Sequence, residues 1–152
     1  MRLTELLTAA RVRTELDSSD KQAALSAMAS LLVGDGDAAR TQEVLDALLA
    51  REQIASTGVG SGVAIPHGHL DIDDVRMALA ISPSGVPFET SDGEPVHILA
   101  AIVGPKGGLG TQLRLLARTA CLLRDRGIRA RLRDAASPAD ALAVMAQEEM
   151  SL

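Results

Sequence analysis

Apolar residues recur at intervals of three and four along several stretches of the chain, and this spacing predicts helices with one buried face. One predicted helix is capped by Ser18 or Ser19 and ends at Gly34, and a second spans about residues 39–51. The last predicted helix has Ser137 as its cap. A further helix of about fifteen residues is predicted after a glycine-rich loop, with a buried side formed by Leu113, Leu116, Ala117, Ala120 and Leu123.

Shorter stretches have the pattern of β-strands. Residues 12–16 alternate between apolar and polar, and residues 63–65 and 75–81 are short and mainly apolar. Residues 97–103 form a longer apolar run, which is typical of a strand buried on both faces. Long crossovers and one short link near Asp92 connect these strands. The alternation of helices and strands predicts an α/β fold, with a mixed parallel and antiparallel sheet of about five strands sandwiched by helices.

The composition predicts one globular domain over residues 1–152, because 47% of the residues are hydrophobic and the length suffices for a single core. A net charge of −5 and a single aromatic residue argue against a nucleic-acid-binding protein. The one cysteine, Cys121, lies among helical leucines, so we expect it in the core of a protein from a reducing compartment. Without a long apolar run or a signal-peptide pattern, we expect a cytoplasmic protein with no membrane insertion.

The strongest candidate for chemistry is the glycine-rich segment 58–68, which ends in Pro-His-Gly. Pro66 lacks a backbone donor and is expected to end the strand before it, which places His67 at a strand end on a rigid turn. Gly62 and Gly68 would let backbone N–H groups approach an anion. The alternative is that His67 is a structural histidine, hydrogen-bonded to a neighbouring carbonyl.

Residues 56–68, Ser-Thr-Gly-Val-Gly-Ser-Gly-Val-Ala-Ile-Pro-His-Gly, resemble the active-site segment of the phosphotransferase-system EIIA domains of the fructose, mannitol and nitrogen-regulatory type. Residues 48–52 resemble the arginine-bearing helix end of that family, residues 95–105 its central strand, and residues 111–117 the helix that follows. The resemblance covers most of the chain and implies a single EIIA type-2 domain of the α/β architecture above. It also implies a phosphohistidine relay protein in which His67 accepts the phosphoryl group.

Imidazole suits such a relay because its neutral form has a free nitrogen lone pair near neutral pH. Charge on the transferring group must be neutralised, and Arg51, Gln112 and the N–H groups of Gly62 and Gly68 are the candidates. Arg51 could instead be an exposed cation favoured by the helix dipole. Many family members carry a second histidine where this chain has Gln112, whose amide donates hydrogen bonds but supplies no titratable proton. Acceptance of phosphate is still expected, whereas the substitution disfavours efficient onward transfer to sugar.

A small, transient partner surface is expected around Ile65 and the loop containing Gly107 and Gly108, with Arg114 at its rim.

His67 and His69 form an H-x-H pair that could bind a metal together with Asp71 or Asp73. No third ligand has a characteristic spacing, so neither a metal nor a cofactor is expected.

Three functions are compatible with these features. The first is a regulatory phosphoprotein that is phosphorylated by an HPr-like phosphocarrier and binds target proteins according to its phosphorylation state. The second is a sugar-specific EIIA that passes phosphate to an EIIB domain for fructose- or mannitol-type uptake. The third is a non-catalytic binding module, which the intact His67 and Arg51 disfavour. We expect a free-standing chain without a fused EIIB domain, which favours regulation.

Overall fold

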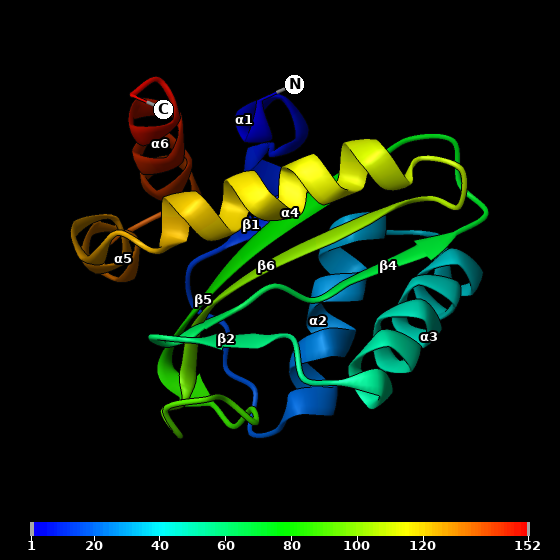
Figure 1. Ribbon diagram of the computed structural model, residues 1–152, viewed down its shortest axis with the longest axis horizontal. Helices are drawn as coiled ribbons and strands as arrows, with labels where there is room; N and C mark the ends of the chain where they lie inside the picture. The colour runs from blue at the N-terminus through cyan, green and yellow to red at the C-terminus, as the bar shows by residue number, and fades with distance from the viewer. Residues whose placement is uncertain (1, 152) are drawn as a thin grey trace.

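A mixed six-stranded sheet with helices on both faces forms the centre of the molecule, as Figure 1 shows for the computed structural model, which describes residues 2–151. The strand order is β1-β5-β6-β3-β2, and β4 also pairs with β6. The strands are β1 (Val12–Arg13), β2 (Gly58–Gly60), β3 (Val63–Ala64), β4 (His67–Leu70), β5 (Arg76–Val86) and β6 (Val96–Pro105). The predicted α/β class and mixed sheet are confirmed, with one strand more than expected.

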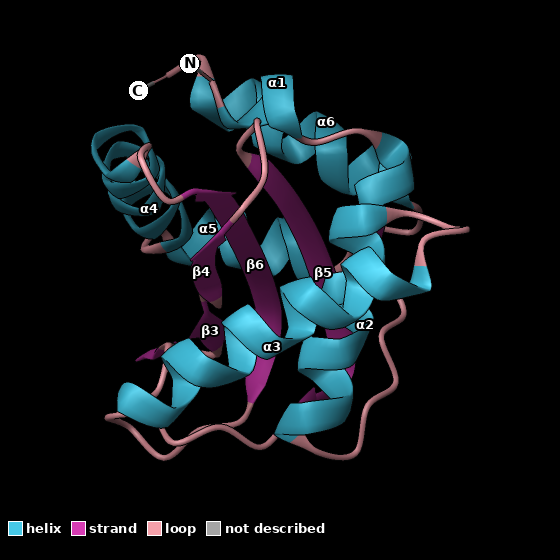
Figure 2. Cartoon of the chain, turned by 90° about the vertical axis from the view of Figure 1, so that its right-hand side faces the viewer, coloured by secondary structure: helices cyan, strands magenta, loops and turns pink. Residues whose placement is uncertain are grey.

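The helices divide into two layers. They are α1 (Leu3–Leu6), the 3₁₀ helix η1 (Ala9–Arg11), α2 (Lys21–Val33), α3 (Ala38–Ile54), α4 (Leu109–Leu123), α5 (Arg126–Arg133) and α6 (Pro138–Glu149). Helices α2 and α3 cover one face of the sheet, nearer the viewer in Figure 2, and α1, α4, α5 and α6 pack on the other. Within residues 2–151, no helix combines the length and the apolar character needed to cross a membrane.

Strands β5 and β6 separate two hydrophobic cores, because successive side chains on a strand point to opposite faces. Ala78, Ala80 and Leu99 belong to the core under α2 and α3. Met77 and Ile102 belong to the core under α4, α5 and α6. The prediction that residues 97–103 are buried on both faces is thereby confirmed for the central antiparallel pair.

The predicted buried side of α4 is wrong in part: Leu123 is buried and Leu116 and Ala120 pack against the core, but Leu113 and Ala117 are exposed. Leu113 is 67% exposed and Cys121 is also exposed, so the expectation that Cys121 lies in the core fails. The helix is rotated so that its buried residues are Gln112, Leu115, Thr119, Leu122 and Leu123. Two faces of this helix are rich in leucine, and periodicity alone does not distinguish them. Hydrogen bonds from the Gln112 amide to the sheet accompany the observed rotation.

The helix ends differ from the predictions in detail. Asp20, rather than Ser18 or Ser19, caps α2 by accepting a hydrogen bond from the Ala23 N–H at 2.7 Å. Ser137 caps α6 as predicted. Helix α5 was not anticipated, because its eight residues include four arginines and only two buried side chains.

Candidate functional site

The glycine-rich segment forms an interrupted strand alongside β6, made of β3 and β4. Val63 in β3 pairs with Ile98, the ladder breaks at residues 65–66, and His67 in β4 pairs with Ile102 in the same parallel direction. Pairing with β6 resumes directly after this break, where the Pro66 carbonyl accepts a hydrogen bond from the Ile102 N–H at 2.9 Å. His67 therefore begins a strand, and the expectation that it ends one and lies on a turn is wrong.

Strand β4 lies between α3 and α4, as Figure 1 shows. Gly68 faces α3, since a Cβ at this position would approach the backbone of Ala47 to 3.2 Å. Leu70 faces the same way and is buried in the core under α2 and α3. Because side chains alternate along a strand, His67 and His69 point to the other face, on which α4 lies.

The tautomer of His67 is fixed by its own backbone. Its Nδ1 lies 2.8 Å from the Ile65 carbonyl oxygen, which can only accept a hydrogen bond, so Nδ1 carries the proton. Nε2 then keeps its lone pair. Partial burial is the main cause that lowers the pKa of His67, with further contributions from the charge of Arg51 and from His69; these outweigh the Ile65 hydrogen bond. The neutral ring is thus a nucleophile that needs no separate base at neutral pH.

Arg51 brings positive charge to the site. It lies one helical turn after Ala47, which packs against Gly68, and α3 continues beyond it to Ile54. One of its five N–H donors, on Nη1, is bound to the Ala55 carbonyl at 2.7 Å. Arg51 is half-buried, and its charge acts on His67. Its predicted part in neutralising phosphoryl charge remains a prediction.

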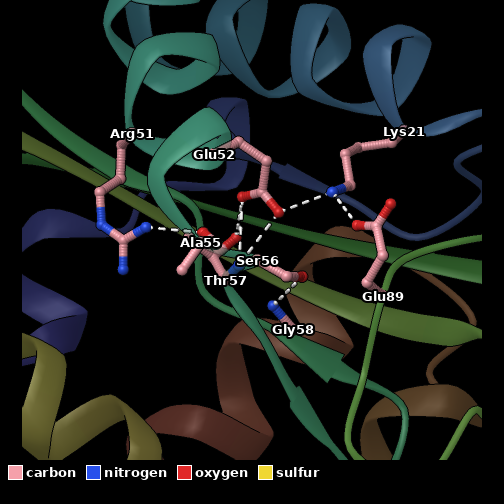
Figure 3. Close-up of polar contacts among 8 residues, drawn as sticks. All are labelled: Lys21, Arg51, Glu52, Ala55, Ser56, Thr57, Gly58 and Glu89. Carbon is pink, nitrogen blue, oxygen red and sulfur yellow. Dashed lines mark hydrogen bonds and ion pairs between the residues drawn. The ribbon is translucent and has the colours of Figure 1, made fainter.

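Glu52 is a residue of this region that the sequence interpretation missed. Its carboxylate is 8% exposed and accepts hydrogen bonds from the Thr57 N–H at 3.0 and 3.2 Å and from the Thr57 hydroxyl at 2.5 Å (Figure 3). Lys21 Nζ lies 2.8 Å away and also pairs with Glu89. Burial raises the pKa of Glu52, but the bonds from Lys21 and Thr57 more than offset it, so the net pKa is lowered.

These contacts hold residues 55–57 in place. The Ala55 carbonyl binds Arg51, and the Thr57 carbonyl accepts from the Ile65 N–H at 3.0 Å. Glu52 is therefore a positioning residue for both Arg51 and the segment that leads to His67. A signal was present in the sequence, because Glu52 follows Val44 and Leu48 on the buried stripe of α3, where a carboxylate requires partners.

Gln112 is 1% exposed and binds the backbone of the sheet. Its Nε2 donates to the Gly68 carbonyl at 2.9 Å and to the Ile102 carbonyl at 3.4 Å. Its Oε1 is buried and accepts no hydrogen bond from residues 2–151. In this arrangement the amide fixes α4 against β4, beside the histidine. Its predicted contact with phosphate remains a prediction.

The structure does not bring both candidate glycines to the acceptor. The Gly62 carbonyl accepts from the N–H groups of His97 and Ile98, whereas His67 pairs with Ile102. Four residues of β6 separate these levels, a distance of about 13 Å. The Gly68 N–H points toward β6, because in a parallel pair of strands alternate residues of each strand form the hydrogen bonds to the neighbouring strand.

The expected partner surface needs one correction. Ile65 is 5% exposed and lies in the core, so it offers no surface to a partner. Gly107 is exposed, Gly108 is the N-cap of α4, and Arg114 is exposed on that helix. Within the described residues, the large apolar side chains that are exposed are Ile54, Val59, Leu109, Leu113 and Met150. Leu109 and Leu113 of α4 therefore replace Ile65 as apolar candidates beside the Gly107 loop.

A metal site around His67 and His69 has no support from the geometry. Among residues 2–151, no three or more His, Cys, Asp or Glu residues lie together in a group that could hold a metal ion.

Comparisons with known proteins agree on one family. Residues 5–148 match the family described as "Phosphoenolpyruvate-dependent sugar phosphotransferase system, EIIA 2". The chain is 36% identical to the nitrogen regulatory protein of Bradyrhizobium diazoefficiens, covering 88% of this chain and 87% of that protein. It is 34% identical to the fructose-specific EIIABC component of Bacillus subtilis over 90% of this chain, which spans 22% of that longer relative.

Solved structures show the same fold. The nitrogen regulatory protein IIA-Ntr from Neisseria meningitidis superposes with a TM-score of 0.87 at 26% identity, covering 94% of this chain and 98% of that one. IIA mannitol from Escherichia coli gives a TM-score of 0.77 at 20% identity, covering 91% and 98% of the two chains.

We predict that Glu52→Gln lowers the free energy of unfolding by about 1–3 kcal/mol at pH 7, because buried donors lose a charged acceptor. The lowered pKa of Glu52 contributes stability above its unfolded value of about 4.3, and this contribution is lost as the pH falls through the folded pKa. The difference between wild type and variant should therefore shrink in acid. Urea unfolding at several pH values measures it.

Glu43→Gln is the matched control, because Glu43 is exposed and pairs only with Arg40 at the surface. Its effect should stay below about 0.5 kcal/mol at every pH. A Glu52→Gln effect as small as that of Glu43→Gln would contradict the positioning role.

Proposed function

Since this chain belongs to the EIIA type-2 family of the phosphoenolpyruvate-dependent sugar phosphotransferase system, we propose that it accepts a phosphoryl group on Nε2 of His67. The donor is an HPr-like phosphocarrier, and the phosphorylated protein acts in regulation. The observation that carries the proposal is the bond between Nδ1 and the Ile65 carbonyl, which directs the lone pair to Nε2.

The geometry supports transfer in both directions. Nε2 forms a bond to phosphorus as the donor's bond to phosphorus breaks, and that electron pair returns to the donor. Nδ1 keeps its proton throughout because the Ile65 carbonyl holds it. A ring protonated at Nδ1 departs as neutral imidazole when an acceptor attacks the phosphorus, so the same contact makes His67 a good leaving group.

Neutralising charge is the main remaining task, because the transition state spreads negative charge over three oxygens. Arg51 is the candidate, with a guanidinium that stays charged at every relevant pH. Its field also favours the neutral imidazole before transfer. The residue thus assists both the nucleophile and the incoming group.

Regulation is supported by the relatives and by Gln112. The Bradyrhizobium diazoefficiens relative and the Escherichia coli relative, 32% identical over 98% of this chain, are both named nitrogen regulatory protein. A buried amide beside His67 cannot become a cation that would stabilise the charge of the transferring phosphoryl group, which favours a long-lived phosphorylated state. In this role a target protein responds to the added charge of about −1.5 to −2.

A second candidate is transfer of the phosphoryl group to an EIIB domain. It is supported by the fructose-specific relative and by the solved complex of mannitol IIA with phosphorylated mannitol IIB from Escherichia coli, which shares this fold at 20% identity. In both functions the exposed α4 residues Leu109 and Leu113 would contribute to a small transient interface with the phosphocarrier.

We predict that His67 is the sole histidine phosphorylated by an HPr-like donor. Wild type, His69→Ala and His97→Ala should carry acid-labile, base-stable label after incubation with the phosphorylated donor, whereas His67→Ala should carry none. Retention of label by His67→Ala would assign the acceptor elsewhere. Phosphorus NMR of the labelled protein should report a phosphorus bonded to Nε2.

Arg51→Ala should slow single-turnover phosphoryl transfer about ten- to a hundredfold, which corresponds to about 1.5–3 kcal/mol for a charge-assisted contact. The fold should persist, because the side chain makes one hydrogen bond to a neighbouring carbonyl. Arg40→Ala, on the same helix at its other end, is the control and should leave the rate unchanged. Equal rates in both variants would reduce Arg51 to a surface cation.

Gln112→His should shorten the lifetime of phosphorylated His67 and increase transfer to an EIIB acceptor, with much less change in acceptance from the phosphocarrier. The reason is that a protonated imidazole places positive charge beside the transferring phosphoryl group, which the neutral amide cannot do. Gln112→Met is the control, since it removes the amide without adding a proton. Rapid transfer to a sugar EIIB by the wild type, with no gain in Gln112→His, would favour the sugar-transport function instead.

A further inference from the structure

A second concentration of positive charge lies on α5, away from His67. Arg126, Arg129 and Arg133 are spaced at i, i+3 and i+7, which places them on one face of the helix. Ile128 and Leu132 are buried against the rest of the domain. Like charges at this spacing destabilise a helix, and a cation in the first turn also opposes the helix dipole. Arg126 is therefore placed unfavourably unless an anion lies near it, whereas Arg133 lies in the last turn, where the helix dipole favours a cation.

These three arginines line a surface pocket of about 230 Å³ together with Ser61, Gly62 and His97. No carboxylate is among the lining residues. Among residues 2–151, neither Arg126 nor Arg133 forms an ion pair, although Arg131 of the same helix pairs with Glu148. Arg129 donates from Nη1 to the Leu123 and Arg124 carbonyls at the end of α4, at 3.0 and 2.6 Å. The pocket therefore holds two guanidinium groups, those of Arg126 and Arg133, that no carboxylate of residues 2–151 pairs with.

The opposite wall is an unusual piece of backbone. Gly60, Ser61 and Gly62 all have positive φ, at 89°, 58° and 77°. Ser61 is the one non-glycine residue with positive φ in the described part of the chain, a conformation that is uncommon for such a residue and often accompanies a functional site. Asp92 holds it there by accepting from the Ser61 N–H at 2.7 Å, without lining the pocket itself.

His97 is held rigidly at the edge of this wall. Its Nδ1 lies 2.9 Å from the Ser82 carbonyl oxygen, which fixes the proton on Nδ1 and leaves Nε2 as the free polar atom of the ring. Gly62 and Gly85 flank the ring. A Cβ at Gly62 would lie 3.6 Å from the ring atom Cδ2, and a Cβ at Gly85 would lie 3.1 Å from Cε1. The bond to Ser82 gives His97 a structural role, and its place in the pocket adds a second.

We propose that this pocket binds the phosphoryl group of a small phosphorylated metabolite. Arginine forks match phosphate oxygens in geometry, and the Ser61 hydroxyl adds a neutral donor. The pocket is lined by no Phe, Tyr or Trp side chain that could stack on a base, so a nucleotide is not the favoured ligand. The site lies beside Ile98, about 13 Å along β6 from the level of His67, and is separate from the phosphoryl acceptor.

An NMR titration of the full chain tests this site, with sodium pyrophosphate as the probe and sodium acetate at equal ionic strength as the comparison. Pyrophosphate should produce saturable shifts of the amide signals of Ser61, Gly62 and residues 126–133, with a Kd below about 1 mM at low salt. Acetate should produce none that saturate. The same saturation in His67→Ala would separate this site from the acceptor, and shifts centred on His67 would overturn the proposal.

Substitutions on α5 test whether pyrophosphate binds in this pocket. Arg126→Gln with Arg133→Gln should weaken pyrophosphate binding at least about tenfold, because two charge-assisted contacts are lost. Arg131→Gln is the matched control on the same helix and should bind as the wild type does. Unchanged affinity in the double variant, with its thermal unfolding also unchanged, would refute the site. Shifts of residues 126–133 by a phosphorylated partner protein but not by pyrophosphate would assign the surface to a protein instead.

Discussion

The position of His67 depends on how closely the backbone of β4 is held between two helices. On one face, α3 approaches so near to Gly68 that a Cβ would meet the Ala47 backbone at 3.2 Å. On the other face, the Gln112 amide donates to the Gly68 carbonyl. A short strand with a single neighbour in the sheet thereby gains the rigidity of a buried element, and its first residue is delivered to the surface in a fixed orientation.

The way β4 is held between α3 and α4 explains why the buried carboxylate of Glu52 affects the proposed phosphoryl site without touching His67. Glu52 ties the end of α3 to Thr57 and Lys21, and the bound loop carries the carbonyl that holds Arg51. The loop also accepts from Ile65, whose own carbonyl sets the tautomer of His67. One chain of hydrogen bonds thus joins Arg51, which is proposed to neutralise charge, to His67, which is proposed to accept the phosphoryl group.

The two arginine-bearing regions differ in how the protein treats their charge. Arg51 lies where its charge adds to the effect of burial in lowering the pKa of His67, which suits a nucleophile. The arginines of α5 surround a hollow without a carboxylate, beside a serine held in a left-handed conformation, which suits a bound anion. Both regions border the same interrupted strand, made of β3 and β4, at its two ends.

The α/β class, the mixed sheet and the buried central strand could be predicted from the spacing of apolar residues along the chain. The family could be predicted from the segment that ends in Pro-His-Gly. Both are local properties of the sequence. It also singled out His67 and Arg51. The tertiary structure alone decided which face of α4 is buried, that His67 begins a strand, that Gly62 lies far from it and that Glu52 organises the loop. These features depend on contacts between residues distant in sequence, such as Gln112 with Gly68, and local spacing carries no information about such contacts.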